Sequence, residues 1–416
     1  MTERFPLKAV ASALLPLFAG LASAATDAEL DAKAQALNRK QLNLDAHTDV
    51  LIASTPERYW APGHGSRTEV AKLTAGSVDV VTVAIAVGPG PRTPEGVAEA
   101  RKEANTKLDT IRAFVKDNAS RVEIALTAAD VERIYKQGKI AVIESFLNAR
   151  SLGTDLNGID EFYKAGVRVF GLTHAGNNDF ADSSRPQKGE GQEHHGLSPL
   201  GKQAIARLNK LGVIVDVSQL TPDGVFQVLA LTKAPVIATH SDVRALVDNT
   251  RNLSDKELDA IKANGGVVSA VPFNAYLAKL PPDFPAKVGA LRKQHGLPAG
   301  FQGQSFTDGA ESLPEAQQAA FTTAYQAIYP KATLKEYVDH IDYLVKRIGV
   351  DHVGIGSDFN HGSGIAGFND ESEAPNVTRE LLRRGYTEAQ IAKIWGGNFL
   401  RVFREVEAAA AKARTT

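Results

Sequence analysis

Short apolar runs rich in β-branched residues recur along the chain, and helix-like amphipathic stretches lie between most of them. Eight of these runs predict strands, at 42–47, 78–87, 139–144, 167–173, 213–218, 235–239, 266–271 and 352–358. Two intervening stretches carry clear helix signals. Ser198 caps the first, which Pro199 opens, and Ser254 caps the second, which Gly265 ends. Continuous apolar strands alternating with helices indicate a parallel sheet covered by helices.

Eight strand and helix units match a closed barrel, so the predicted fold class is α/β, a (β/α)8 TIM-type barrel. An open doubly wound sheet stays open as an alternative. The segment "GPGPRTPEG" lacks the strand, glycine spacing and helix of a dinucleotide fingerprint. Residues 277–333 form a long interruption after the seventh strand, and they predict either a lid over the barrel mouth or an insertion without function.

The first 24 residues have the pattern of a secretory signal peptide. Arg4 and Lys8 precede the apolar run "AVASALLPLFAGLASA", which is short for a membrane span. The expected organisation is therefore a signal peptide at 1–24 and a single barrel domain at 25–416. The expected product is periplasmic or secreted, without stable membrane insertion after signal cleavage.

Composition narrows the chemistry. With 43% hydrophobic and 23% charged residues, the chain of 416 residues has the make-up of a globular protein with a large core. The formal net charge is −1, so no long-range field would attract nucleic acid, and no nucleic-acid partner is expected. Because the chain has no cysteine, any metal must bind through His, Asp, Glu or amide ligands.

Ionisable or amide side chains stand at the carboxyl ends of most predicted strands, which is the edge where barrel enzymes build their active sites. These residues are His47, Asp49, Glu144, His174, Gln219, His240 and Asp358. Each one alone has an ordinary structural explanation, as a cap or a paired buried group. Those explanations would have to hold at every strand together, so the pattern favours one polar site.

Three of these residues carry a more specific argument. His47 and Asp49 are two residues apart on an extended chain, so both side chains point the same way and can bind one cation. Glu144 closes an apolar strand, where a buried carboxylate is costly unless it is paired or bound to metal. His361 follows Asp358 closely but is not assigned to the site.

Six segments together resemble the membrane dipeptidase (renal dipeptidase) family of zinc peptidases, in the amidohydrolase superfamily. They are "DAHTD" at 45–49, "LTHAGNNDFADSS" at 172–184, "GLSPLG" at 196–201, "ATHSDVRALVDNTRNLSD" at 238–255, "DHVGIGSDFNHG" at 351–362 and "GGNFLRVFREV" at 396–406. They keep the family's order and cover nearly the whole predicted mature chain. The HxD pair of the first strand, in place of HxH, distinguishes this family from its relatives.

The resemblance implies a barrel that uses two zinc ions. His47 and Asp49 match the ligands of one ion, Glu144 matches the carboxylate that bridges both, and His240 matches a ligand of the second. The family's other histidine for the second ion falls on Gln219, whose amide oxygen is a weaker ligand. We therefore expect one tight Zn²⁺ site, with Gln219 as a weak ligand, a support for bound water, or the mark of a lost second site.

The resemblance also implies hydrolysis of dipeptides to amino acids by a metal-bound hydroxide, with Asp358, His174 and Glu144 as catalytic residues. The expected substrate-binding residues are Arg251, which matches the arginine that holds the free carboxylate, His174 at the peptide carbonyl and Asp358 at the departing amine. The expected partner is a small dipeptide, with tolerance of a D residue at its C-terminal position. A homodimer stays open as an assembly.

Two other functions stay open. One is a non-hydrolytic barrel that binds an exported peptide product or assists its maturation. In that case Gln219 would mark the loss of turnover. The other is a hydrolase of another small amide. His174, Arg251 and Asp358 favour hydrolysis of a substrate that carries a free carboxylate.

Overall fold

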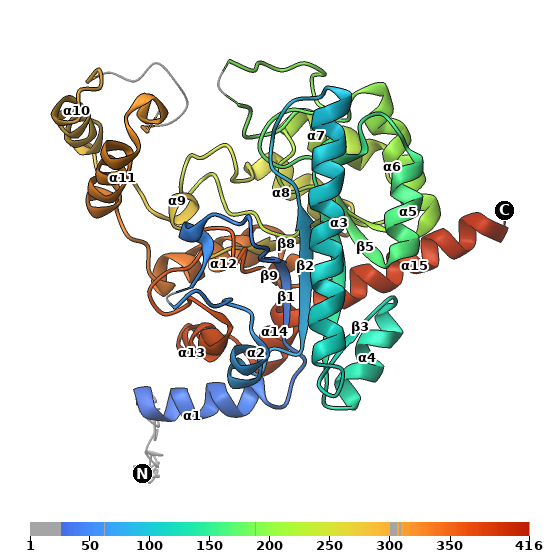
Figure 1. The fold of residues 1–416 in the computed structure, drawn as a ribbon. Helices are drawn as coiled ribbons and strands as arrows, with labels where there is room; N and C mark the ends of the chain where they lie inside the picture. The colour runs from blue at the N-terminus through green and yellow to red at the C-terminus, as the bar shows by residue number, and fades with distance from the viewer. Residues whose placement is uncertain (1–25, 62, 188, 300–305, 308, 416) are drawn as a thin grey trace, which may run out of the picture.

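Parallel strands form one sheet with the order β1-β2-β4-β5-β6-β7-β8-β9 in a computed structural model (Figure 1). The model describes residues 26–415 except 62, 188, 300–305 and 308. The strands are β1 (Leu44–Asp49), β2 (Val80–Ala86), β4 (Ile140–Leu147), β5 (Val167–Gly171), β6 (Ile214–Asp216), β7 (Ile237–Ala238), β8 (Val267–Ala270) and β9 (Val353–Ile355). Each of the eight predicted runs overlaps one of them.

The two ends of the sheet meet just beyond β9. Thr48 forms a parallel bridge with Phe359, and the Asp49 N–H donates to the Phe359 carbonyl at 3.0 Å. The sheet is thus a nearly closed parallel barrel, which confirms the predicted fold class. One short strand that the sequence pattern did not predict, β3 (Val122–Ile124), pairs with β4 outside this order.

Helices follow most strands and cover the outside of the barrel. They are α1 (Asp27–Asn38), α2 (Val70–Gly76), α3 (Pro94–Asp117), α4 (Ala128–Lys136), α5 (Asn157–Ala165), α6 (Pro199–Leu211), α7 (Pro222–Leu231), α8 (Asp255–Ala263), α12 (Leu334–Ile348), α13 (Ala374–Arg383), α14 (Glu388–Ala392) and α15 (Asn398–Thr415). The predicted caps are present: Ser198 accepts from the Gly201 N–H and Ser254 accepts from the Glu257 N–H. Each cap satisfies a donor that its helix leaves unpaired.

The barrel interior is closed at the amino ends of the strands. Leu44 is the first residue of β1 and Val80 is the first residue of β2. Both share one buried cluster with Phe399 and Phe403 of α15. Helix α15 crosses beneath the strands in Figure 1 and contacts β6, β8 and β9. Polar chemistry is therefore left to the opposite, carboxyl end of the barrel.

The predicted interruption contains short helices. Helices α9 (Asn274–Leu277), α10 (Phe284–Gln294) and α11 (Glu315–Ile328) lie between β8 and α12. Helices α10 and α11 project to one side of the barrel in Figure 1. A buried cluster of their own, which includes Leu291 and Phe321, holds them together.

The predicted signal peptide, residues 1–24, lies outside the described part of the chain. Among the helices that are described, none has the length and hydropathy needed to cross a membrane.

Candidate active site

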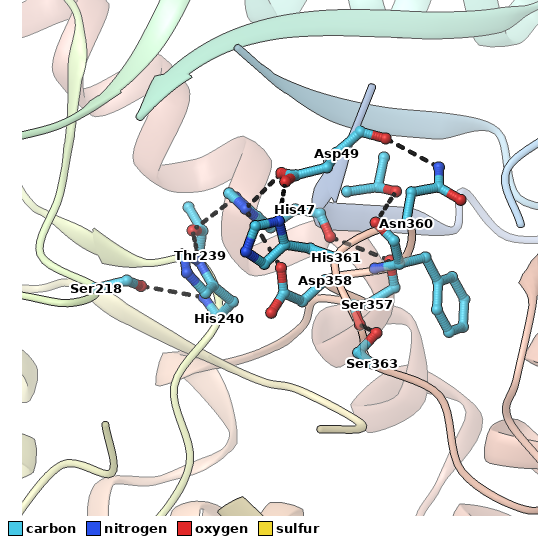
Figure 2. A network of polar contacts seen from close by, with 12 residues as sticks. His47, Asp49, Ser218, Thr239, His240, Ser357, Asp358, Asn360, His361 and Ser363 are labelled. Carbon is cyan, nitrogen blue, oxygen red and sulfur yellow. Dashed lines mark hydrogen bonds and ion pairs between the residues drawn. The ribbon is translucent and has the colours of Figure 1, made fainter. Parts of the chain in front are cut away.

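Side chains from β1, β7 and β9 converge at the carboxyl end of the barrel (Figure 2). His47 and Asp49 lie at the end of β1, His240 just after β7 and Asp358 just after β9. All four are buried, and the rings of His47 and His240 stack with their centroids 3.9 Å apart. The structure thus brings together four of the predicted site residues.

Three of these residues leave ligand atoms free to bind one cation. The His47 Nε2 atom lies 3.5 Å from Asp49 Oδ1 and 3.8 Å from Asp358 Oδ1, and the three donors lie within 4.8 Å of one another. His47 Nε2 and Asp49 Oδ1 are buried and have no hydrogen-bond partner. Buried polar atoms normally have partners, so these orphaned atoms fit a divalent metal ion.

A second group of possible metal ligands consists of His47, Asp216 and His240. The hydroxyl of Thr239 already lies within hydrogen-bond distance of all three side chains. The Thr239 hydroxyl lies 2.6 Å from Asp216 Oδ2, 2.8 Å from His240 Nδ1 and 3.4 Å from His47 Nδ1. The hydroxyl thus already contacts all three side chains, and it orients the two imidazoles. The sequence analysis missed Asp216 and Thr239; the signal for Asp216 was a carboxylate at the end of an apolar strand.

Gln219 lies in the site, but its amide nitrogen faces the histidines. Gln219 Nε2 is 2.8 Å from His174 Nδ1 and 3.0 Å from His240 Nε2, whereas the buried Oε1 has no partner. An amide nitrogen only donates, so both imidazole nitrogens act as acceptors here. The His240 lone pair that a second metal would use is therefore engaged by Gln219, and this arrangement does not fit a second ion.

The same hydrogen bonds fix the proton positions of two neutral imidazoles. His240 accepts at Nε2, so its Nδ1–H donates to Thr239, whose hydroxyl donates to Asp216. His174 accepts at Nδ1, so its proton is on Nε2. Burial lowers the pKa of both histidines well below the usual value, which keeps both rings neutral at pH 7.

Glu144 is not part of this cluster, and the prediction that it reaches the site is wrong. Strand β4 runs on to Leu147, so Glu144 lies within the strand and its side chain points away from the barrel interior that Ile143 faces. The carboxylate packs against Gly166, and its nearest cations are Arg112 and Arg168. Burial raises the pKa of Glu144 to about 7, and neither oxygen has a hydrogen-bond partner.

Arg251 is a buried cation beside the cluster. Its side chain is only 3% exposed, and it donates to the His240 carbonyl at 3.1 Å. Its guanidinium lies 5.3 Å from the centre of the Tyr276 ring. Nε has no partner, and in the described part of the chain no carboxylate lies within ion-pair distance. A buried charge without a counter-ion is costly, so this position favours an anionic ligand.

His361, which the sequence analysis did not assign to the site, belongs to it. Its Nδ1 lies 2.7 Å from Asp49 Oδ2, and its ring stacks on Tyr59 at 4.9 Å. Burial would raise the pKa of Asp49, but the charge and hydrogen bond of His361, with the contribution of His47, hold that pKa well below its usual range. In the sequence, the closeness of His361 to Asp358 was the signal that could have assigned His361 to the site.

Asp358 has the properties of a proton donor. It is buried, and burial raises its pKa to about 6. Its backbone φ of 50° lies in the left-handed region that non-glycine residues rarely adopt, as does that of Gln219 at 70°. Such strained conformations are concentrated at functional sites.

Two cavities open onto these residues. The smaller, of about 530 Å³, is lined by Asp49, His174 and His361 among others. The larger, of about 1940 Å³, is lined by Arg251 and by Tyr325 of α11. The interruption between β8 and α12 therefore walls the space next to Arg251.

A parallel α/β barrel that gathers histidines and carboxylates at the carboxyl ends of its strands is typical of metal-dependent hydrolases. Within this class, the chain belongs to the membrane dipeptidase family, peptidase family M19, whose family model matches residues 31–416. This match confirms the family that the six segments predicted.

Individual relatives agree. The chain is 32% identical over 309 residues to dipeptidase tcpJ of Claviceps purpurea, covering 74% of this chain and 61% of that protein. It is 30% identical to dipeptidase verJ of Clonostachys rogersoniana, covering 76% of this chain and 69% of that one. The chain thus spans about two thirds of the length of these relatives. The crystal structure of the probable dipeptidase PvdM from Pseudomonas aeruginosa has 41% sequence identity and a TM-score of 0.82, over 92% of this chain and 99% of that one.

Proposed function

We propose that the protein is an exported, zinc-dependent dipeptidase that hydrolyses a dipeptide to two amino acids. The observation that carries this proposal is the pairing of an orphaned ligand set with an unpaired buried cation. The free atoms of His47 and Asp49 stand beside Asp358, and Arg251 lies next to them without an acidic partner. Family membership supports the same reaction.

Arg251 and His174 position the substrate. The guanidinium of Arg251 binds the free carboxylate of the dipeptide, since a planar guanidinium can pair with both oxygens. His174 lines the smaller cavity and carries its proton on Nε2, so it donates to the peptide carbonyl oxygen. That hydrogen bond strengthens as negative charge develops on the oxygen during attack.

One metal position fits the residues. His47 and Asp49 would hold it, with Asp358 beside it, and zinc is proposed because histidine with carboxylate is a common zinc ligand set. When bound, zinc supplies a Lewis acid that activates water and polarises the carbonyl. Gln219 engages the His240 lone pair that a second ion would need, and Glu144 lies outside the cluster.

Asp358 serves as the acid and base of the reaction. A carboxyl group with a pKa of about 6 exchanges protons readily near neutral pH. It accepts a proton from the attacking water and delivers it to the departing amine. Its place beside His47 keeps it within the same small cluster.

The setting of the reaction is also proposed. The pattern of residues 1–24 supports export to the periplasm or outside the cell. Dipeptides with a C-terminal D residue are proposed as substrates beside L,L dipeptides, and fragments of peptidoglycan would supply them in the periplasm.

The test is amino-acid release from L,L and L,D dipeptides by the zinc-loaded protein, with Asp49→Ala as the blank. We expect turnover that the blank loses, because the substitution removes a metal ligand. Metal content and circular dichroism are measured on both proteins. A folded, metal-loaded wild type that cleaves no member of the panel would overturn the proposal. It would favour the second candidate, a barrel that binds a peptide without turnover, which the engaged Gln219 also supports.

A further inference from the structure

A second arginine, Arg185, faces the same space as Arg251 and has no acidic partner. It lies in the segment between β5 and α6 and lines both the smaller and the larger cavity. Its Nε is buried without a hydrogen-bond partner, and within the described residues no carboxylate lies within ion-pair distance of its guanidinium. The cavities thus meet at a cation that nothing in the described protein neutralises.

The backbone around Arg185 is held firmly in place. The Arg185 N–H donates to Ser183 Oγ at 3.1 Å, and its carbonyl accepts from the Gly176 N–H at 2.8 Å. The neighbouring Ser184 N–H donates to the Gln219 carbonyl at 2.8 Å. These bonds tie the segment to the end of β6, so the side chain is presented from a fixed base.

Arg185 acts on the substrate-binding residues themselves. Burial is the main reason that the pKa values of His174 and Arg251 are lowered, and the charge of Arg185 lowers both further. Arg185 shares the smaller cavity with His174 and the larger cavity with Arg251, the two groups that would hold the peptide carbonyl and the free carboxylate. Two like charges that face one cavity repel each other until anions fill the space between them.

The other lysine and arginine side chains of the smaller cavity are in different surroundings. Lys107 lines the smaller cavity but pairs with Glu103, with Nζ and Oε1 3.2 Å apart. Arg58 lines the same cavity at its rim, where it is exposed and lies 4.5 Å over the ring of Tyr59. Arg58 therefore offers a control that shares the cavity and the charge of Arg185 but is solvated.

We propose that Arg185 determines specificity by binding a second carboxylate of the substrate, so that the preferred dipeptides end in an acidic residue. The free α-carboxylate of a dipeptide would neutralise Arg251 but leave Arg185 unpaired. A second carboxylate, on the side chain of the same C-terminal residue, would neutralise Arg185. This inference rests on the proposed dipeptidase function for the identity of the ligand. The chemistry it requires is two carboxylates held by two guanidinium groups.

The experiment measures binding separately from turnover. Phosphinate analogues of Ala-Glu and Ala-Gln cannot be hydrolysed and differ only in the charge of the last side chain. We expect the zinc-loaded wild type to bind the Glu analogue about tenfold more tightly, which is the effect of one charge-assisted hydrogen bond. Arg185→Gln should bind both analogues within about twofold while keeping the wild-type affinity for the Gln analogue. Arg58→Gln should behave like the wild type.

Three other outcomes would count against this role of Arg185. Equal affinity of the wild type for the two analogues would overturn the inference, and so would a loss of affinity for both analogues in Arg185→Gln, which would indicate a structural role. A preference only for analogues with an acidic N-terminal residue would refute the C-terminal placement. If the analogues bind with the expected preference but Ala-Glu itself is not cleaved, the proposed hydrolysis fails and the role of Arg185 stands.

Discussion

At the scale of single residues, Gln219 occupies the side of the site where the family resemblance implies a second metal ion. Its amide nitrogen donates to His174 and to His240, and the second of these bonds engages the His240 lone pair that a second metal would use. A histidine at this position would supply a ligand in place of a competing donor. We therefore expect the metal content to respond to a change at this position.

The first prediction concerns Gln219→His. After dialysis against zinc, the metal content of Gln219→His should rise from about one ion per chain towards two, because an imidazole replaces the amide donor. Mass spectrometry of the metal in pure protein measures this. Gln219→Ala, which offers no ligand, should stay near one ion. Equal metal content in Gln219→His and the wild type would contradict the account of Gln219.

Glu144 shows how a shift of one position in a strand moves a side chain to the other face. The sequence places it at a strand end, but β4 continues to Leu147 and the carboxylate packs beside Gly166. Its pKa rises from 4.5 to about 7 because of burial. Between these two pH values, Glu144 keeps its proton in the native state but loses it in the unfolded chain. The contribution of protonated Glu144 to the free energy of unfolding is therefore fully present below pH 4.5 and is lost as the pH rises through 7.

The second prediction is that Glu144→Gln stabilises the protein at high pH without loss of function. At pH 8 the free energy of unfolding should rise by about 1–3 kcal/mol, since a neutral amide replaces a buried carboxylate. At pH 4.5 the gain should be much smaller. Denaturant unfolding at both values measures the difference. If Glu144→Gln instead lost zinc and activity as Asp49→Ala does, Glu144 would be a metal ligand after all.

At the scale of elements, α10 and α11 form a unit with its own small core. Phe321 is fully buried in a cluster with Leu291 and Leu297, which is separate from the barrel clusters. Tyr325 and Tyr329 of the same segment line the larger cavity. The segment can therefore loosen without unfolding the barrel, and it would change the cavity as it does so.

The third prediction compares two buried phenylalanines. Phe321→Ala should speed hydrogen exchange in α10 and α11 while the midpoint of global unfolding stays the same, because the cavity it creates is confined to that cluster. Phe403→Ala removes a ring from the barrel interior and should cost about 3–5 kcal/mol of global stability. Exchange mass spectrometry and denaturant unfolding report the two effects. A global loss in Phe321→Ala would show that the segment unfolds together with the barrel.

At the scale of the whole molecule, the candidate metal position lies where the first and last strands of the barrel meet. His47 and Asp49 belong to β1, and Asp358 follows β9 on the other side of this junction. Among the described residues, a few backbone hydrogen bonds join β1 to the segment after β9. In one of them the Asp358 N–H donates to the His47 carbonyl at 2.7 Å. A bound metal would link the first and last strands of the barrel.

The fourth prediction follows from this position. Zinc at one hundred times its dissociation constant should raise the free energy of unfolding by about 2.7 kcal/mol, and removal by a chelator should reverse the gain. Hydrogen exchange at the ends of β1 and β9 should slow in parallel. Calorimetry with and without zinc measures the gain, and Asp49→Ala should show almost none of it. If the unfolding temperature were the same with and without zinc, the metal would not bind at this position.

The sequence alone determined the barrel strands, the helix caps, the family and the gathering of His47, Asp49, His240 and Asp358 at one end. Those features depend on local periodicity and on the rule that parallel strands share a carboxyl edge. The tertiary structure decided which way Glu144 points, which atom of Gln219 meets the histidines, and that Thr239, His361 and Arg185 share the site. Strand length, side-chain rotation and contacts between distant loops set these features, and packing across the whole barrel fixes them.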